Sequence, residues 1–319
     1  MANVLVIGAV GQIGTELTME LRKKHGGNNV VASTRKTPFP PEMEKSGPCI
    51  YFDVQDREAT KRAIKEHGVD TVYQLASLLS ATGEKDPDLA FSINLLGLKN
   101  TLDACRECGV KKVFWPSSIA AFGPTTPRER TPQRTVLEPT TMYGVTKVAG
   151  ELLMQYYRRK YGLDTRSVRY PGLISYKAEP GGGTTDYSVA IFYDAIKHGK
   201  YTCFVSKETV LPMMYMPDAI RGTIELMDAP REKLTVDTSY NLAAISFSAG
   251  ELADEVARLV PGFSCDYKPD HRQKIADSWP KSIDDSQARV DWGWRHEYDL
   301  ERMSKDMIAN LRPMLQEKG

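Results

Sequence analysis

The first 175 residues alternate between short hydrophobic runs and longer stretches with helical periodicity. Residues 4–7 contain no polar side chain, as expected of a strand that is buried on both faces of a sheet. Further strands are predicted at residues 29–33, 50–54, 71–76, 112–115 and 165–170. Helical patterns end at residue 24 and cover about 88–108 and 141–161. Strand-helix units that recur about every 30 residues predict an α/β fold with a Rossmann-type, doubly wound parallel sheet.

The pattern is less regular after residue 175. Residues 212–216 are predicted to form another buried strand, in which methionines fill the core. Helices are predicted at about 187–198, 218–227 and 248–259. We therefore expect a first domain over residues 1–175, to which a segment near 212–247 returns, and a smaller C-terminal α/β domain over residues 176–319.

Composition excludes several classes of function. Of the 319 residues, 41% are hydrophobic and 26% are charged, as is usual for soluble globular proteins. The formal net charge of +1 gives no global field that would attract nucleic acid or an anionic membrane. Five scattered cysteines lack metal-ligand spacing, so we expect reduced thiols and no metal site. Without a targeting peptide or a membrane-length run, we expect a cytoplasmic protein with no nucleic-acid or membrane partner.

A glycine-rich turn follows the first predicted strand. Gly8, Gly11 and Gly14 lie between this strand and the next helix. In this pattern the first glycine permits a tight turn, the second lets the backbone approach a pyrophosphate, and the third allows close helix-strand packing. The helix N-terminus adds free N–H groups and partial positive charge. The turn therefore predicts a dinucleotide site that includes Gln12 and Ile13, although a turn that merely needs glycines is the structural alternative.

The end of the second predicted strand leaves the choice of dinucleotide open. A carboxylate commonly stands there and binds the adenosine ribose, but this sequence has Ser33, Thr34, Arg35 and Lys36. Without the acid, Arg35 or Lys36 is able to pair with a 2′-phosphate, so NAD and NADP both remain candidates. After the third strand, Asp53 stands where it is able to accept a hydrogen bond from the adenine amino group.

Tyr143 and Lys147 are four residues apart in the helix predicted at 141–161, so they share one face. A positive charge near a phenol lowers its pKa from about 10 and makes it a usable general base near neutral pH. Ser117 or Ser118, after the fifth predicted strand, offers a hydroxyl that polarises a substrate oxygen. Such Tyr-Lys pairs also arise by chance on solvated helices, so this pair gains its weight from the dinucleotide turn upstream.

A glycine-rich segment at residues 179–187 precedes the helix predicted at 187–198. Three consecutive glycines make this segment costly to order, so it either moves or allows close approach of its backbone. Thr184, Thr185 and Asp186 offer polar contacts at the start of the helix. Capping of the helix by Thr185 or Asp186 and contact with a ligand are both compatible with the sequence.

These motifs resemble the extended short-chain dehydrogenase/reductase (NAD-dependent epimerase/dehydratase-like) family, and more closely its L-threonine 3-dehydrogenase branch. The resemblance covers nearly the whole chain. Its later motifs lie at residues 77–81, 115–119, 122–127, 170–175, 181–187, 212–216, 273–280 and 283–289. It implies oxidation of the 3-hydroxyl of L-threonine to L-2-amino-3-oxobutanoate, with hydride transfer to NAD, by a homodimer. The first domain would bind the dinucleotide and the second would mainly bind substrate.

The resemblance also implies a role for each matching residue. Tyr143 would be the base, Lys147 would lower its pKa and bind the nicotinamide ribose, and Ser118, with Ser117 beside it, would be the catalytic hydroxyl. The implied substrate contacts are Ser80, Ser117, Tyr143, Gly183, Thr184, Thr185 and Asp186. The implied cofactor contacts are Gly8, Gly11, Gln12, Ile13, Gly14, Thr34, Arg35, Asp53, Val54, Leu75, Ala76, Ser77, Asn94, Pro116, Tyr143, Lys147, Tyr170 and Pro171. Thr34 departs from the family, which normally has aspartate there.

Two other functions are compatible with these residues. One is a nucleotide-sugar epimerase or reductase on the same fold, and the other is a non-catalytic NAD(P)-binding sensor. Ser118, Tyr143 and Lys147 argue against a sensor, because a sensor has no use for an activated phenol. A pocket built from hydroxyls and one carboxylate fits a small zwitterion better than it fits a sugar nucleotide.

Overall fold

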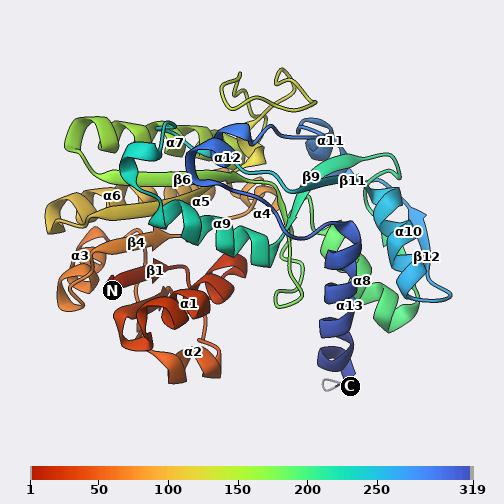
Figure 1. The fold of residues 1–319 in the computed structure, drawn as a ribbon, viewed down its shortest axis with the longest axis horizontal. Coiled ribbons are helices and arrows are strands. Elements are labelled where there is room, and N and C mark those ends of the chain that lie inside the picture. Colours follow the sequence, from red (N-terminus) through yellow and green to blue (C-terminus); the bar gives the residue numbers. More distant parts are fainter. Residues whose placement is uncertain (1, 317–319) are drawn as a thin grey trace.

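The computed structural model describes residues 2–316 and confirms an α/β fold built on a parallel, doubly wound sheet (Figure 1). Seven strands lie in the order β10-β6-β5-β4-β1-β2-β3, each parallel to its neighbours. Their bounds are β1 (Val4–Ile7), β2 (Val30–Thr34), β3 (Cys49–Tyr51), β4 (Thr71–Gln74), β5 (Lys112–Ser118), β6 (Asp164–Tyr170) and β10 (Tyr240–Asn241). Every side chain of β1 is buried, which explains its uniformly hydrophobic run.

Helices cover both faces of this sheet. Successive side chains of a strand point to opposite faces, so Val4 and Val6 join one core cluster while Leu5 and Ile7 join the other. The first cluster includes side chains of α1 and α9, and the second includes side chains of α3, α6 and α7. The bounds in this part are α1 (Gln12–His25), η1 (Gly27–Asn29), α2 (Pro41–Ser46), α3 (Arg57–Glu66), α4 (Ser80–Gly83), η3 (Ile119–Ala121), α7 (Met142–Tyr161), α9 (Met216–Asp228), η4 (Arg231–Lys233) and α12 (Ser286–Trp292).

The prediction of one continuous helix over residues 88–108 is wrong in one respect, because three consecutive helical elements cover this range. They are α5 (Pro87–Phe91), a π-helical turn η2 (Ser92–Leu96) and α6 (Gly97–Cys108). The π turn carries Asn94, which is buried and bonds both the N–H and the carbonyl oxygen of Leu78, at 2.8 and 3.1 Å. Periodicity did not reveal the turn because a π turn interrupts a helix only locally.

The remaining elements form a smaller α/β part around a third core cluster, at the right in Figure 1. In the predicted strand at 212–216, Met213 and Met214 are fully buried, as expected of core filler. From the second half of the chain, α9 and β10 return to the central sheet, while the predicted boundary at residue 175 stays a prediction. The bounds are β7 (Gly172–Ile174), α8 (Tyr187–His198), β8 (Lys200–Cys203), β9 (Val210–Tyr215), β11 (Ile245–Ser248), α10 (Ala249–Leu259), β12 (Ser264–Tyr267), α11 (His271–Asp277) and α13 (Leu300–Gln316).

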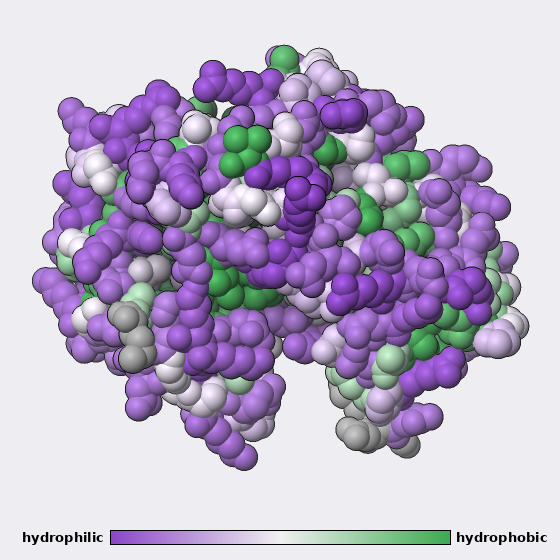
Figure 2. All heavy atoms as spheres, in the orientation of Figure 1, coloured by the Kyte–Doolittle hydropathy of each residue, from purple (hydrophilic) through white to green (hydrophobic). Residues whose placement is uncertain are grey.

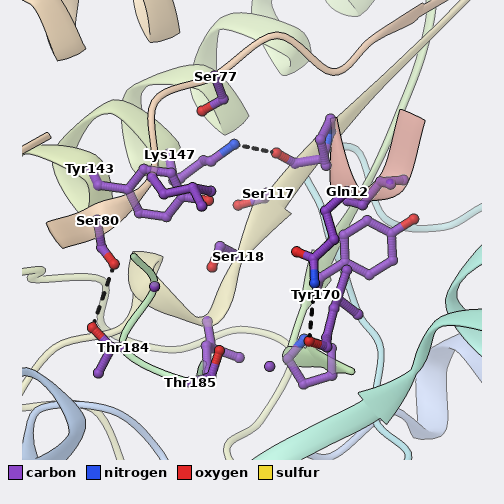
Figure 3. A pocket seen from close by; sticks show the side chains of 18 of the residues that line it. Gln12, Ser77, Ser80, Ser117, Ser118, Tyr143, Lys147, Tyr170, Thr184 and Thr185 are labelled. Atoms are coloured by element: carbon purple, nitrogen blue, oxygen red, sulfur yellow. Dashed lines mark hydrogen bonds between the residues drawn. The ribbon is translucent and has the colours of Figure 1, made fainter. Parts of the chain in front are cut away.

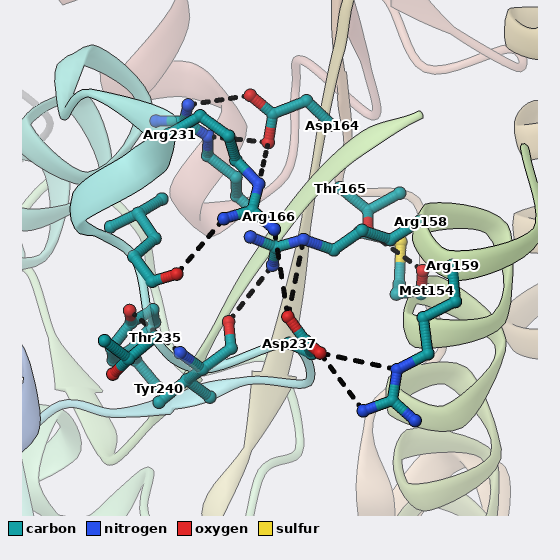
Figure 4. Close-up of polar contacts among 12 residues, drawn as sticks. Met154, Arg158, Arg159, Asp164, Thr165, Arg166, Arg231, Thr235, Asp237 and Tyr240 are labelled. Atoms are coloured by element: carbon teal, nitrogen blue, oxygen red, sulfur yellow. Dashed lines mark hydrogen bonds and ion pairs between the residues drawn. The ribbon is translucent and has the colours of Figure 1, made fainter. Parts of the chain in front are cut away.

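An arginine-rich cluster ties the end of α7 to β6 and to the segment after α9 (Figure 4). Arg166, at the start of β6, is buried, pairs with Asp164 at 2.7 Å and donates to three carbonyl oxygens at and just after the C-terminal end of α9. Asp237 accepts a 3.1 Å hydrogen bond from Arg159 of α7. The cluster lies at the amino end of β6, opposite to the edge where parallel sheets bind ligands.

The surface in Figure 2 is mainly hydrophilic, with hydrophobic side chains in small separate groups. Exposed large hydrophobic side chains are concentrated on α5, η2 and α7. They include Leu89, Phe91, Leu96, Val145, Leu152 and Tyr156. Within residues 2–316, no helix is both long enough and apolar enough to cross a membrane.

Candidate active site

Two adjoining cavities lie along the carboxyl edge of the central sheet. The first, of about 280 Å³, lies between the glycine-rich turn, the end of β5, α7 and the segment 183–186 (Figure 3). The second, of about 220 Å³, lies beyond the ends of β2 and β4. Both are lined by Gly8, Gly11, Leu75 and Ser77, so they adjoin at the glycine-rich turn. Open parallel sheets bind ligands at this edge.

Nearly all the residues predicted from the sequence line one cavity or the other. The first cavity is lined by Gly8, Gly11, Gln12, Ile13, Gly14, Leu75, Ser77, Ser80, Pro116, Ser117, Ser118, Tyr143, Lys147, Tyr170, Pro171, Gly183, Thr184, Thr185 and Asp186. The second is lined by Thr34, Arg35, Asp53, Val54 and Ala76. Asn94 is among the lining residues of neither, and its bonds to Leu78 shape the loop after β4 instead.

Several residues that line the first cavity were missed as site residues. They are Leu79, Ile119, Gly172, Leu173 and Trp279. Trp279 follows α11 and is only 5% exposed. Its motif contributes to the family resemblance, but no spacing in the sequence connects it with the edge of the sheet.

The glycine-rich turn fits a dinucleotide pyrophosphate. Gly8 has a φ of +85°, and a Cβ added to it would lie 2.8 Å from the Ala76 nitrogen. A Cβ on Gly14 would lie 2.2 Å from the Gly8 carbonyl oxygen. Gly11 stands at the N-cap of α1 without a side-chain cap, so the first N–H groups of this helix need other partners. Phosphate oxygens would supply them.

The second cavity has no carboxylate at the end of β2. Thr34 is buried at this position and lines the cavity, and its side chain carries an uncharged hydroxyl. The Arg35 guanidinium is half exposed and lies 3.8 Å from the Asp53 carboxylate, which also accepts the N–H of Gln55 at 2.9 Å. This end of the site therefore combines a neutral hydroxyl with a weakly paired arginine.

Lys147 is buried, and its ammonium is held from two sides. Its Nζ donates a 2.6 Å hydrogen bond to the Pro116 carbonyl oxygen and lies 4.5 Å from the centroid of the Trp115 ring. The Tyr143 ring centroid is 5.1 Å away, on the same helix face as predicted. Desolvation lowers the pKa of Lys147 to about 7, although the Glu151 carboxylate opposes this shift.

The sequence analysis predicted that Lys147 lowers the pKa of Tyr143. This prediction is wrong when only the residues of the protein are present, because together they raise that pKa. Tyr143 is half-buried, yet desolvation of its hydroxyl raises the pKa to about 12, while a hydrogen bond with Ser118 acts in the opposite direction. The sequence pattern placed Lys147 on the same face but did not show that its ammonium is bonded to Pro116. Formation of the phenolate therefore needs further positive charge.

Ser117 and Ser118 have different partners. Ser117 is buried and its hydroxyl donates a 2.6 Å hydrogen bond to the Glu151 carboxylate. Ser118 is half-buried, its Oγ accepts the N–H of Ala120 at 3.2 Å, and its hydroxyl lowers the pKa of Tyr143. Of the two serines, Ser118 is thus the one whose hydroxyl affects the phenol.

The opposite wall of the first cavity carries the polar residues of the segment 183–186. Ser80 and Thr184 have their hydroxyl oxygens 3.5 Å apart (Figure 3). Asp186 stands at the N-cap of α8 but makes no side-chain cap bond. Its Oδ2 instead accepts the N–H groups of Gly182 and Gly183, both at 2.8 Å. Capping of α8 by the Asp186 side chain is therefore wrong, and the carboxylate shapes the loop that lines the cavity.

Comparison with known proteins decides the family. The model of the NAD dependent epimerase/dehydratase family matches residues 4–243. The chain belongs to this family. An uncharacterised epimerase/dehydratase of Staphylococcus haemolyticus is 47% identical over the full length of both chains.

Two solved structures are similar over the whole chain. A partial consensus L-threonine 3-dehydrogenase is 51% identical, with a TM-score of 0.95, and the match covers 98% of this chain and 99% of that one. A monomeric L-threonine 3-dehydrogenase from a metagenome, in its apo form, is 49% identical, with a TM-score of 0.94 and the same coverage. The protein is an enzyme of the extended short-chain dehydrogenase/reductase type, which oxidises a hydroxyl group of a small molecule with a nicotinamide dinucleotide.

The buried ammonium gives a prediction about stability. Because the pKa of Lys147 falls from 10.5 to about 7 on folding, the unfolded chain binds more protons between these pH values. Stability of the wild type therefore rises with pH in this window, and Lys147→Met removes that rise. We therefore expect the melting temperature of the variant to become lower, relative to that of the wild type, as the pH rises from about 6 to about 10. Thermal unfolding followed by circular dichroism measures this difference.

Lys160, which is exposed near the end of the same helix, provides the control. Lys160→Met should change the melting temperature little at any pH. A Lys147→Met difference that stays constant with pH would contradict the account of a desolvated ammonium.

Proposed function

We propose that this protein is an L-threonine 3-dehydrogenase, which oxidises the 3-hydroxyl of L-threonine to L-2-amino-3-oxobutanoate and transfers hydride to NAD. The observation that carries the proposal is the match over the whole chain to solved L-threonine 3-dehydrogenases, with which about half of the residues are identical. The first cavity supports it, because about 280 Å³ lined by hydroxyls and a carboxylate suits a small zwitterion better than a sugar nucleotide.

Tyr143 is the general base of this proposal. Its phenolate oxygen takes the proton of the substrate hydroxyl as C3 loses hydride, and a ketone results. Ser118, whose hydroxyl lowers the pKa of Tyr143, donates to the same substrate oxygen. A bound oxidised nicotinamide supplies the hydride acceptor and a positive charge that favours the phenolate. The Lys147 ammonium, 5.1 Å from the Tyr143 ring centroid, adds a second positive charge.

The polar wall opposite Tyr143 holds the amino acid in this proposal. The hydroxyls of Ser80 and Thr184, 3.5 Å apart, and that of Thr185 donate to the substrate carboxylate. Asp186 accepts two backbone N–H groups on Oδ2, and its Oδ1 receives the substrate ammonium. These contacts fix C3 between the base and the nicotinamide, and such orientation accounts for much of the rate of a hydride transfer.

Replacement of Tyr143 by Phe tests the proposed base. Tyr143→Phe keeps the ring that lines the first cavity and removes only the hydroxyl, so the variant should largely retain NADH binding by fluorescence titration. Oxidation of L-threonine, followed by absorbance of the reduced nicotinamide, should fall about 100-fold or more, as expected for the loss of a general base. Tyr161→Phe, at the exposed end of α7, is the matched control and should leave the rate unchanged. Retained turnover in Tyr143→Phe would contradict the assignment, and wild-type protein that binds NADH without oxidising threonine would favour the sensor or nucleotide-sugar alternatives.

We propose NAD as the cofactor, with NADP also accepted because Thr34 places no negative charge near a 2′-phosphate. Replacement of Thr34 by Asp should weaken NADPH binding about 10-fold or more while NADH binding is retained, since like charges at an interface are costly. Fluorescence titration with both reduced cofactors measures the ratio. Thr37→Asp adds the same charge at an exposed position and should leave the ratio unchanged. An unchanged ratio in Thr34→Asp would show that this residue does not face the ribose.

We also propose a homodimer formed through α5, η2 and α7, whose exposed faces carry Leu89, Leu96, Leu152 and Tyr156. Exposed apolar faces of this kind commonly mark contact surfaces. Light scattering after size exclusion should give about twice the chain mass of 35.7 kDa for the wild type and the chain mass for Leu152→Glu. Val290→Glu, at a residue that is 79% exposed on α12, is the control and should stay dimeric. A monomeric wild type, as described for one of the similar structures, would contradict this proposal.

A further inference from the structure

Three neighbouring strands bring polar side chains to one level of the central sheet. In the strand register, Arg169 of β6 pairs with Ser117 of β5 on one side and with Asn241 of β10 on the other. Register partners in a parallel sheet point to the same face. The three side chains therefore stand in a row beneath α7, directly behind the wall of the first cavity that Ser117 lines.

The Glu151 side chain of α7 contacts this row of polar side chains. It lies four residues after Lys147 and eight after Tyr143, so the three share one helix face. One carboxylate oxygen accepts Ser117 at 2.6 Å and the Arg169 Nε at 2.8 Å, and the other accepts the Arg169 Nη2 at 2.7 Å. Glu151 is 1% exposed and Arg169 is 3% exposed, so this two-pronged ion pair is fully buried.

The far side of Arg169 reaches other segments of the chain. Its Nη1 donates to the Asn241 side-chain oxygen and to the Gln133 carbonyl oxygen, both at 3.0 Å. The Asn241 amide in turn donates to the carbonyl oxygens of Thr131 and Asp284, at 3.0 and 3.1 Å. The pair thus joins α7 to the loop before it, to β10 and to the segment that precedes α12.

A gain in folding stability does not by itself explain why the protein has the buried Glu151–Arg169 ion pair. Burial of two charges costs hydration, and replacement of a buried ion pair by apolar side chains is often neutral or stabilising. The ion pair holds a hydrogen-bond acceptor in a fixed position for the Ser117 hydroxyl. It also places the negative charge of Glu151 one helical turn after Lys147. The Glu151 charge raises the pKa of Lys147 against the effect of desolvation.

We propose that Glu151 and Arg169 are positioning residues of the active site, which hold Ser117 in place and set a carboxylate behind the Lys147 ammonium. The role in turnover rests on the proposed function, whereas the role in cofactor binding requires only the nicotinamide dinucleotide of the family. In this arrangement the Glu151 charge keeps Lys147 protonated, so that the ammonium would hold the nicotinamide ribose and support the Tyr143 phenolate.

Two variants test the proposal. Glu151→Gln keeps the shape of the side chain and removes its charge, and the double variant Glu151→Gln with Arg169→Met leaves no unpaired charge in the core. For each, NADH affinity by fluorescence and kcat and KM for threonine oxidation are measured between about pH 5.5 and 9. We expect the pH at which NADH affinity and kcat decline on the alkaline side to fall by about one unit, because loss of a nearby negative charge makes a lysine deprotonate earlier. We also expect kcat to change more than KM.

Asp164→Asn is the matched control, because it removes the carboxylate of the other buried arginine pair on β6, at the opposite end of the strand (Figure 4). It should lower the melting temperature but leave the pH profiles unchanged. If Glu151→Gln fails to fold, the pH profiles of the double variant test the proposal instead. Wild-type pH profiles in a folded variant, or the same shift in Asp164→Asn, would overturn the proposal. If the wild type does not oxidise threonine, the proposed function fails, and the NADH profiles still test the positioning pair.

Discussion

The burial of Lys147 is the constraint on which the rest of the site depends. An ammonium taken out of water loses its hydration, at a cost of several kcal/mol unless nearby groups replace it. Here the Pro116 carbonyl oxygen and the Trp115 ring replace part of that hydration, and Glu151 provides the opposite charge. Because these groups belong to β5 and α7, the two elements must stay in close contact. Gly150 permits this contact, since a Cβ there would lie 2.4 Å from the Trp115 ring.

The two cavities separate the chemistry of the reaction from the choice of cofactor. The first contains the phenol, the ammonium and the hydroxyls that act on the substrate in the proposed reaction. The second contains Thr34, Arg35 and Asp53, none of which lines the first. A change at the end of β2 is therefore able to alter which dinucleotide binds without disturbing the reacting groups. This separation would allow Thr34 to stand where the resemblance implies aspartate while Ser118, Tyr143 and Lys147 keep the pattern that it implies.

The fold and the position of the site were predictable because both follow from local patterns. The run at residues 4–7, the glycine-rich turn after it and the four-residue spacing of Tyr143 and Lys147 each have a direct structural meaning. The pKa of Tyr143 was not predictable, because it depends on desolvation of the hydroxyl and on the nearby Ser118 hydroxyl. The Glu151–Arg169 pair was missed for a similar reason, since it depends on the register of three strands that are far apart in the sequence.

The central claim is that hydride leaves C3 of L-threonine and passes to the nicotinamide. It is tested most directly with L-threonine deuterated at C3, incubated with the protein and NAD or NADP, followed by mass spectrometry of the reduced cofactor. The account predicts reduced cofactor that carries the deuterium, together with L-2-amino-3-oxobutanoate. Reduced cofactor without deuterium, or no reduction with either dinucleotide, would contradict it.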